Sequence, residues 1–159
     1  MTFDPRYSME AIDRPDQLYA GAKGLIIFGG SLVLSYVRDG NTTSFPHYVD
    51  LPGGGRELGE TPFETFQRET KEEFDLDIRR SDISFGMSYP SMTDPTVPGY
   101  FLVANKPLSA QADIHFGDEG EYYQVTTLDK LLAEPLLVPF LHDKVELYLA
   151  HVTPTQLAV

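Results

Sequence analysis

Short apolar runs separated by turn residues fill the first third of the chain. Residues 22–28 and 31–37 are rich in aliphatic and β-branched side chains, and the Gly29-Gly30 pair between them favours a tight turn. We therefore predict a β-hairpin. The segments after it are predicted to be a polar loop over 39–46, a short strand over 48–51 and a glycine-rich loop over 53–55.

The clearest helical periodicity begins at Thr61. Thr61 suits an N-cap, Pro62 suits the first helical position, and Glu64 completes a capping box. The side chains that fall on one narrow stripe of this helix are Phe63, Phe66, Thr70 and Phe74. We predict a helix from Thr61 to about Phe74 that buries this stripe, with Asp75 as a left-handed C-cap.

The second half of the chain returns to short strands and ends in helices. The expected elements are strands over 83–89, 100–104 and 122–125, a proline-rich loop over 90–98, an acidic loop over 113–120, and helices over 128–133 and 139–151. Strands and helices do not alternate regularly, so the order favours an α+β fold with a mixed sheet over a doubly wound fold. We expect an irregular lead-in over 1–19, one domain over 20–152 and a tail over 153–159.

Composition and charge narrow the range of partners. The 159 residues, 42% of them hydrophobic, suffice for one domain with a full core. Cysteine is absent, which excludes disulfides and cysteine-based sites and fits a cytoplasmic location. The net charge of -12 disfavours a nucleic acid polymer or an anionic membrane as partner. We expect a small-molecule partner and a monomer or homodimer.

Three glutamates gather on one flank of the predicted helix. Glu69, Glu72 and Glu73 are one to four residues apart, and like charges at helical spacing repel. Such a pattern alone is more often a solvated helix face, but three carboxylates also form the hard oxygen ligand set that suits Mg²⁺ or Mn²⁺. Through such an ion an acidic protein can bind a polyanion. Arg68 is expected to pair with Glu64 or Glu72.

The sequence around this helix resembles the signature box of the Nudix hydrolases. Residues 54–76, GGRELGETPFETFQRETKEEFDL, carry every charged position of that box at its spacing. The matching positions are Gly54, Glu60, Arg68, Glu69, Thr70, Glu72, Glu73, Asp75 and Leu76. Two of them depart from the pattern. Thr70 replaces an aliphatic residue, with its hydroxyl expected to bond back to the helix, and Asp75 replaces the glycine that ends the helix.

The resemblance implies a fold and a set of metal ligands. The fold would be the Nudix-type α/β/α sandwich with a mixed β-sheet. The ligands of Mg²⁺, or of Mn²⁺, would be Glu69, Glu72, Glu73 and the backbone carbonyl of Gly54. Arg68 would orient one carboxylate, and Glu60 would brace the junction between the loop and the helix.

The implied activity is metal-dependent hydrolysis of the diphosphate linkage in a nucleoside diphosphate derivative. The short chain favours a nucleoside triphosphate as substrate, with ADP-ribose or a nucleotide sugar as the alternative. A non-catalytic nucleotide-sensing module is a further alternative, although such modules usually lose box carboxylates that this chain keeps. The isoprenoid-diphosphate isomerase branch uses a catalytic cysteine, which is absent here. An mRNA-decapping role would require a basic surface for the RNA, and the net charge of -12 argues against one.

The general base is left open by the sequence. The resemblance implies a late acidic residue that serves as base or as a further metal ligand, and Glu119 and Glu121 are the candidates. A solvated acidic turn is an equal alternative for this run. If neither residue is the base, Glu72 and Glu73 of the box helix are the remaining catalytic candidates.

Three further side chains are candidates for substrate binding. The resemblance implies a phosphate-binding arginine in this part of the chain, and Arg38 is the candidate. A plain surface role for Arg38 is nearly as well supported. The aromatic rings of Tyr89 and Phe101 could flank a nucleobase, because aromatic faces stack on bases. Tyr100 is a similar candidate, but alternation along a strand sends Tyr100 and Phe101 to opposite faces. At least two of these three rings are expected in the core.

Overall fold

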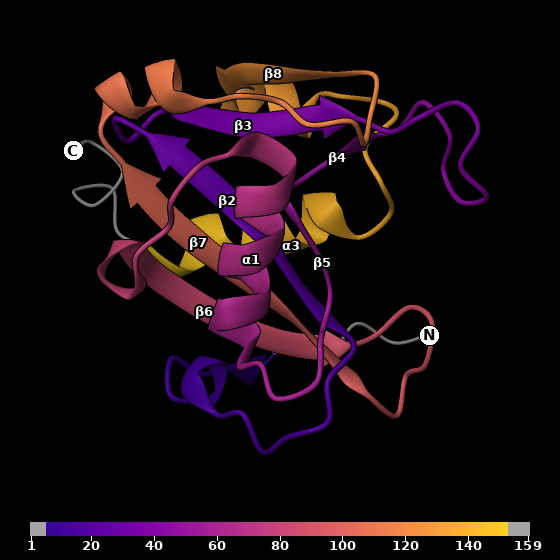
Figure 1. Cartoon of the computed structure of the whole chain (residues 1–159), viewed down its shortest axis with the longest axis vertical. Helices are drawn as coiled ribbons and strands as arrows, with labels where there is room; N and C mark the ends of the chain where they lie inside the picture. The colour runs from indigo at the N-terminus through magenta and orange to yellow at the C-terminus, as the bar shows by residue number, and fades with distance from the viewer. Residues whose placement is uncertain (1–5, 153–159) are drawn as a thin grey trace.

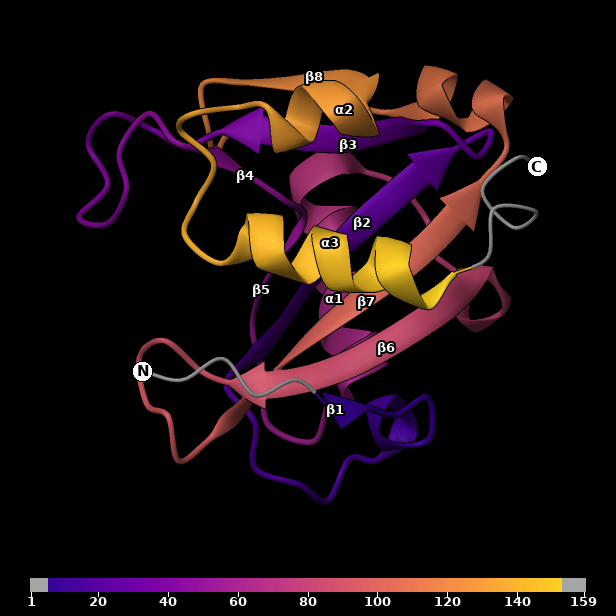
Figure 2. The same ribbon diagram turned by 180° about the vertical axis from the view of Figure 1, so that it is seen from behind.

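A mixed β-sheet with helices on both faces forms the body of the molecule (Figures 1 and 2). The computed structural model describes residues 6–152. The strands are β1 (Arg6–Tyr7), β2 (Gly21–Phe28), β3 (Leu32–Val37), β4 (Val49–Asp50), β5 (Gly53–Gly55), β6 (Ile83–Pro90), β7 (Pro98–Lys106) and β8 (Tyr122–Thr127). The α-helices are α1 (Pro62–Phe74), α2 (Leu128–Leu132) and α3 (Leu141–His151).

The strand order confirms the predicted fold class. It runs β1-β6-β7-β2-β3-β4, with β5 also paired to β2 and β8 to β3. The β2–β7 pair is parallel and the other pairs are antiparallel, so the sheet is mixed. Figure 1 shows α1 across one face of this sheet, and Figure 2 shows α3 across the opposite face. The result is an α+β fold of the α/β/α sandwich type.

Glycines shape the sheet at two places. The predicted hairpin of β2 and β3 is present, and Gly29 and Gly30 turn it with φ angles of 59° and 79°, which glycine adopts without steric cost. The prediction of a loop over 53–55 was wrong, because this segment is β5 and pairs with β2. A Cβ on Gly53 would lie 2.2 Å from the carbonyl oxygen of Ala22. Glycine permits this close approach, and its low strand propensity concealed the strand.

Helix α1 has the predicted start, buried face and end. The Thr61 hydroxyl accepts from the Glu64 N–H and the Glu64 carboxylate accepts from the Thr61 N–H, both at 3.0 Å. Asp75 ends the helix in the left-handed region with a φ of 54°. The buried stripe contains Phe63, Phe66, Thr70 and Phe74. One detail was wrong: the buried hydroxyl of Thr70 has no hydrogen-bond partner within residues 6–152.

Two hydrophobic cores lie on the two faces of the sheet. The core beneath α1 includes Phe66 and Phe74 of the helix and Tyr100 of β7. The core beneath α3 includes Val145 of the helix and Phe101 of β7. The neighbours Tyr100 and Phe101 therefore face opposite ways, as the alternation predicted.

The segment before β2 contributes more than an irregular lead-in over 1–19 would. From Arg6 onward it forms β1, which pairs with β6, and a 3-10 helix at Ala11–Asp13. Ile12 and Tyr19 are 0% and 1% exposed, in the core beneath α1. Residues 1–5 of the predicted lead-in and the predicted tail over 153–159 lie outside the described residues.

The last helix begins later than predicted. Phe140 has a φ of 70°, so the chain is not yet helical there and α3 starts at Leu141 rather than at Pro139. None of the helices within residues 6–152 is long and apolar enough to cross a membrane.

Candidate active site

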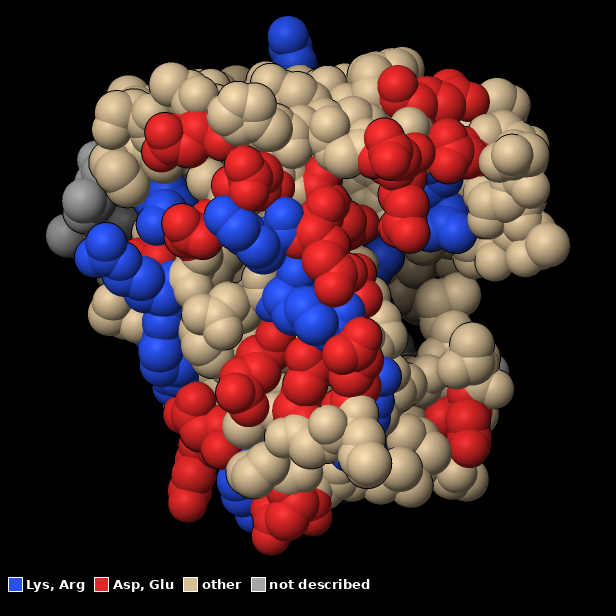
Figure 3. All heavy atoms as spheres, viewed as in Figure 1, with Lys and Arg blue, Asp and Glu red and all other residues tan. Residues whose placement is uncertain are grey.

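Arg68 ties the acidic flank of α1 to the loop before the helix. Its Nε donates to Glu60 Oε2 at 2.7 Å, and its Nη1 donates to Glu69 Oε1 at 3.0 Å. Glu72 Oε2 lies 3.3 Å from Nη1, so this predicted pair is present. The pair with Glu64 is not found, because that carboxylate closes the capping box. Figure 3 shows acidic side chains gathered around a basic patch over α1.

Glu60 braces the junction between the loop and α1, as predicted. Its Oε1 accepts from the Thr65 hydroxyl at 2.9 Å and from the Glu57 N–H at 2.8 Å. Its backbone carbonyl accepts from the Tyr19 hydroxyl at 2.9 Å. The hydrogen bonds from Arg68 lower the pKa of Glu60, so the carboxylate stays charged and holds the guanidinium beside the flank.

Glu73 is a buried carboxylate on that flank, only 6% exposed. Its Oε1 accepts a hydrogen bond from the backbone N–H of Gly53 at 3.0 Å. Burial raises the pKa of Glu73 to about 8, although the Gly53 hydrogen bond and the charge of Lys23 act in the opposite direction. A nearby cation favours the ionised form of a buried carboxylate, so the surroundings of Glu73 fit a metal ion.

Gly54 leaves room for the carboxylate of Glu69. A Cβ on Gly54 would lie 2.5 Å from the Glu69 carboxyl carbon, so a larger residue would displace that side chain. Burial raises the pKa of Glu69, against the lowering effect of Arg68. The Glu72 side chain, by contrast, is 58% exposed. This backbone cradle and three hard carboxylates suit Mg²⁺ or Mn²⁺.

The carboxylates are not yet arranged around a common point. Within residues 6–152, no three acidic or histidine side chains have a geometry that could already hold one ion. The reason is local, because Glu69 is hydrogen-bonded to Arg68 and Glu73 to the Gly53 N–H. The flank holds the three glutamates close together, and a metal ion shared by them would require side-chain rotation.

The late acidic run lies against the end of α1. The N–H of Gly117 donates to the Glu73 carbonyl at 2.8 Å, which anchors the backbone of the run. Asp118 and Glu119 then line a cleft together with Glu72 and Glu73. The structure thus brings together one of the two late candidates and two glutamates of the box.

The other late candidate has a different partner. Glu121 Oε1 lies 2.7 Å from Nδ1 of His47, in the segment that follows the 39–46 loop. The N–H of Glu121 donates to the Val37 carbonyl at 2.8 Å, which fixes its place beside β3. Of the two predicted bases, Glu119 is the one that the structure places at the glutamate cleft.

A second charged group lies within the sheet, around the fully buried Asp50 of β4. Lys23 Nζ lies 2.6 Å from Oδ1 of Asp50, and Arg38 Nη1 lies 2.8 Å from Oδ2. Burial raises the pKa of Asp50, but Lys23, the Leu51 N–H and Arg38 together lower it by more, so the carboxyl is ionised. Arg38 Nε also donates to the Ser44 carbonyl at 3.1 Å. Phosphate binding by Arg38 therefore stays a prediction.

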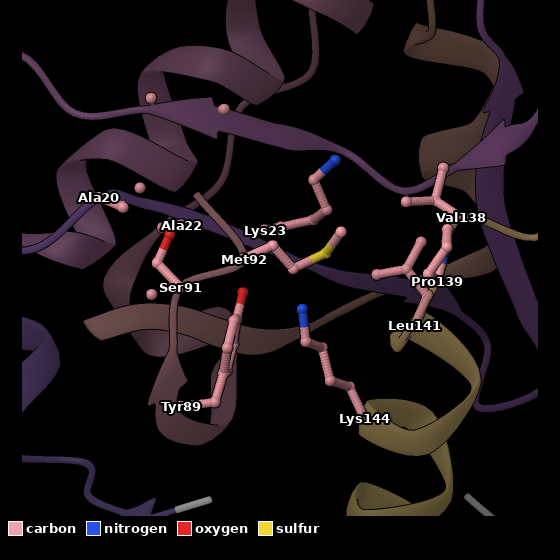
Figure 4. A pocket seen from close by; sticks show the side chains of 14 residues that line it. Ala20, Ala22, Lys23, Tyr89, Ser91, Met92, Val138, Pro139, Leu141 and Lys144 are labelled. Atoms are coloured by element: carbon pink, nitrogen blue, oxygen red, sulfur yellow. The ribbon is translucent and has the colours of Figure 1, made fainter. Parts of the chain in front are cut away.

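The two aromatic candidates have different surroundings. Tyr89 lines a pocket between β2, β5 and α3 (Figure 4). Its hydroxyl donates to the Tyr100 carbonyl at 3.3 Å. Phe101 is fully buried beneath α3, so the prediction that it stacks on a substrate was wrong. Lys23 and Lys144 also line the pocket, and the sequence analysis missed both. A lysine inside an apolar strand, as at Lys23, was a usable signal.

Comparison with solved structures shows the same fold. A MutT protein from Methanosarcina mazei Go1 is 23% identical, with a TM-score of 0.66 over 85% of this chain and 96% of that one. A bifunctional NMN adenylyltransferase/ADP ribose pyrophosphatase from Francisella tularensis, complexed with AMP and a Mn ion, is 16% identical, with a TM-score of 0.62 over 86% of this chain and 43% of that one. A C. elegans Ap4A hydrolase is 19% identical, with a TM-score of 0.57 over 83% of this chain and 99% of that one.

Sequence comparison assigns the family. No curated protein matches the chain. The family model for the NUDIX domain matches residues 20–146, which include all of the box and both late acidic candidates. The resemblance seen in the box is thus confirmed over most of the chain. The chain belongs to the NUDIX domain family of hydrolases.

Proposed function

We propose that the protein is a Mg²⁺-dependent hydrolase that cleaves the diphosphate linkage of a nucleoside diphosphate derivative, with a nucleoside triphosphate as the first candidate. One observation carries the proposal. Glu69, Glu72 and Glu73 share one flank of α1, and the latter two line a cleft together with Glu119. The guanidinium of Arg68 lies beside Glu69 and Glu72. This cluster of carboxylates favours binding of a divalent cation, and a polyanionic substrate can bind to the protein through that cation.

The three glutamates of α1, Arg68 and Glu119 each have a chemical task in this proposal. Glu69, Glu72 and Glu73 would hold a divalent cation, Mg²⁺ or Mn²⁺, which would neutralise charge on the diphosphate and on the leaving phosphate. Arg68 fixes the carboxylate of Glu69. Glu119 takes the proton of the attacking water. The water oxygen then bonds to one phosphorus while the bond from that phosphorus to the bridging oxygen breaks.

Two alternatives to a nucleoside triphosphatase remain in the proposal. Proteins of the same fold include one named an ADP ribose pyrophosphatase and one named an Ap4A hydrolase, which makes ADP-ribose, nucleotide sugars and dinucleotides reasonable second candidates. A non-catalytic sensing module would bind nucleotide without turnover. We further propose a cytoplasmic monomer or homodimer whose partner is a small nucleotide and neither a nucleic acid polymer nor a membrane.

A substrate panel tests the proposed function. Purified protein with Mg²⁺ is incubated with nucleoside triphosphates, ADP-ribose, nucleotide sugars and Ap4A, and released nucleotide, phosphate and pyrophosphate are quantified. We expect turnover of at least one nucleoside triphosphate. Turnover of ADP-ribose alone would shift the substrate class. Tight nucleotide binding without turnover of any compound would contradict hydrolysis and support the sensing module.

A further inference from the structure

Lys144 of α3 is a buried cation whose donors lack protein acceptors. Its side chain is 5% exposed, and its Nζ lies 3.7 Å from the centroid of the Tyr89 ring. Within residues 6–152, its ammonium donates no hydrogen bond to another residue. Figure 4 shows the Lys144 amine and the Tyr89 hydroxyl pointing into the same space.

That space is the pocket described above, and its walls are mainly apolar. Its cavity volume of about 230 Å³ lies below the roughly 300–1,000 Å³ of sites for drug-sized ligands, so it suits one ring system rather than a whole nucleotide. The apolar side chains around it include Ala22, Met92, Val138, Pro139 and Leu141. Among the described residues that line it, none is an aspartate or a glutamate.

The pocket borders the proposed reaction site. Gly54 and Gly55 of β5 line it, and Gly54 is the residue whose backbone faces the Glu69 carboxylate. A nucleotide with its diphosphate at the α1 glutamates can therefore extend its base across β5 toward Lys144. Apolar walls suit a flat ring better than a second phosphate group, which would need more polar partners.

The hydrogen-bond donors of Lys144 indicate which functional group of a bound ring would face them. An ammonium that lines an apolar pocket without a protein acceptor has only water to fill its donors, and partial burial weakens that solvation. Burial lowers the pKa of Lys144 to about 7, with the charge of Lys23 acting in the same direction and Asp50 and Asp143 opposing it. Near neutral pH a substantial fraction of Lys144 is therefore still charged. A ligand oxygen within reach would fill its donors, whereas a ligand amino group would face them with further donors.

We propose that this pocket binds the nucleobase and that Lys144 selects bases with a carbonyl oxygen at C6 of a purine or C4 of a pyrimidine, as in guanine and uracil, over adenine and cytosine, which carry an amino group at that position. The inference rests on the proposed function, since it concerns the substrate of the same site. Lys144 is then a specificity-determining residue, and its amine is held over the face of the Tyr89 ring.

Paired substrates test the selection. At pH 6.5, kcat/KM is measured for GTP against ATP and for UTP against CTP, because each pair exchanges a carbonyl oxygen for an amino group. We expect the carbonyl member to be favoured by about 10- to 100-fold, the range of a charged hydrogen bond. The purine and pyrimidine pairs together show which ring size the pocket takes. A preference in neither pair would overturn the proposal.

Two variants and a binding measurement separate this inference from the proposed function. Lys144→Met keeps the length of the side chain without its charge, and we expect it to remove the preference. Lys130→Met removes an exposed lysine of α2 and should leave the preference unchanged. Calorimetry with α,β-methylene analogues of GTP and ATP reports binding even if no nucleotide is hydrolysed. Equal affinity of the wild type for both analogues, or an undiminished preference in Lys144→Met, would overturn the role of Lys144.

Discussion

At the scale of single residues, the two late carboxylates offer a matched pair. Glu119 lines the glutamate cleft, whereas Glu121 is paired with His47. We expect Glu119→Gln to lower kcat by about 10²-fold or more while metal affinity is kept, because a general base is lost. Glu121→Gln should retain a near-normal kcat. The measurement is steady-state kinetics together with Mn²⁺ titration of each variant.

Other outcomes for this pair are equally informative. A loss of metal affinity in Glu119→Gln would make Glu119 a further ligand instead of the base. Normal rates in both variants would contradict the assignment of Glu119 as the base. The late acidic run would then be a solvated turn without a catalytic role. The base would then lie on α1, where Glu72 and Glu73 are the remaining candidates.

Thr70 gives a prediction about stability alone. Its side chain is fully buried in α1, and its hydroxyl has no hydrogen-bond partner within the described part of the chain. A buried polar group without a partner costs about 1–3 kcal/mol. Thr70→Val replaces the hydroxyl with a methyl group of similar size, so we expect the free energy of unfolding to rise by about 1 kcal/mol in urea denaturation. A decrease would show that the hydroxyl is satisfied in solution.

At the scale of elements, the pairing of β5 with β2 places a backbone cradle beside α1. A Cβ on Gly54 would lie 2.5 Å from the Glu69 carboxyl carbon, whereas a Cβ on Gly55 would meet no atom within 4 Å. We expect Gly54→Ala to displace Glu69, weaken Mn²⁺ binding by about 10-fold or more, in line with the loss of a supporting contact, and lower kcat. Isothermal titration with Mn²⁺ measures the effect.

Gly55→Ala is the matched control for this substitution. It adds the same methyl group one residue away, so it should bind Mn²⁺ like the wild type. Equal Mn²⁺ affinity of the two alanine variants would contradict the role given to the cradle.

The elements also show which features the sequence predicts and which it conceals. The limits of α1 are local in origin, since a capping box and one left-handed residue set them, and both were visible at Thr61, Glu64 and Asp75. The strand β5 could not be predicted from the sequence, because its three glycines have low strand propensity. Glycine is needed there because the backbone of β5 passes very close to that of β2.

The candidate site divides in the same way. The glutamate flank followed from helical spacing within one segment. The choice of Glu119 over Glu121 depends on the hydrogen bond from Gly117 to the end of α1, and the pocket depends on α3 meeting β6 at Lys144 and Tyr89. Contacts between segments far apart in the chain leave no periodic signal in one sequence, so these features needed the structure.

At the scale of the whole molecule, the buried Lys144 links stability to pH. Its pKa of about 7 in the folded protein lies below the ordinary value of 10.5. Between these values the unfolded chain binds the proton and the folded protein does not, so this residue makes the free energy of unfolding rise with pH. The charged groups around it are Lys23, Asp50 and Asp143, and its amine lies over the Tyr89 ring.

The linkage is measured by comparison with a variant that lacks the amine. Urea denaturation of the wild type and of Lys144→Met is followed from pH 7 to pH 10. We expect the stability of the wild type to rise relative to that of Lys144→Met across this window. Parallel profiles would show that Lys144 titrates normally in the folded protein.

In the proposed mechanism, hydrolysis depends on a divalent cation held by the α1 glutamates. The most direct measurement is the rate of nucleotide hydrolysis by metal-stripped protein as free Mg²⁺ is raised from zero in the presence of EDTA. We expect no turnover without metal and recovery with Mg²⁺ or Mn²⁺. We also expect a kcat lower by about 10²-fold or more in Glu73→Gln, because the amide oxygen can still accept from the Gly53 N–H but the charge is lost. Full turnover in EDTA, or a normal kcat in Glu73→Gln, would contradict the proposed mechanism.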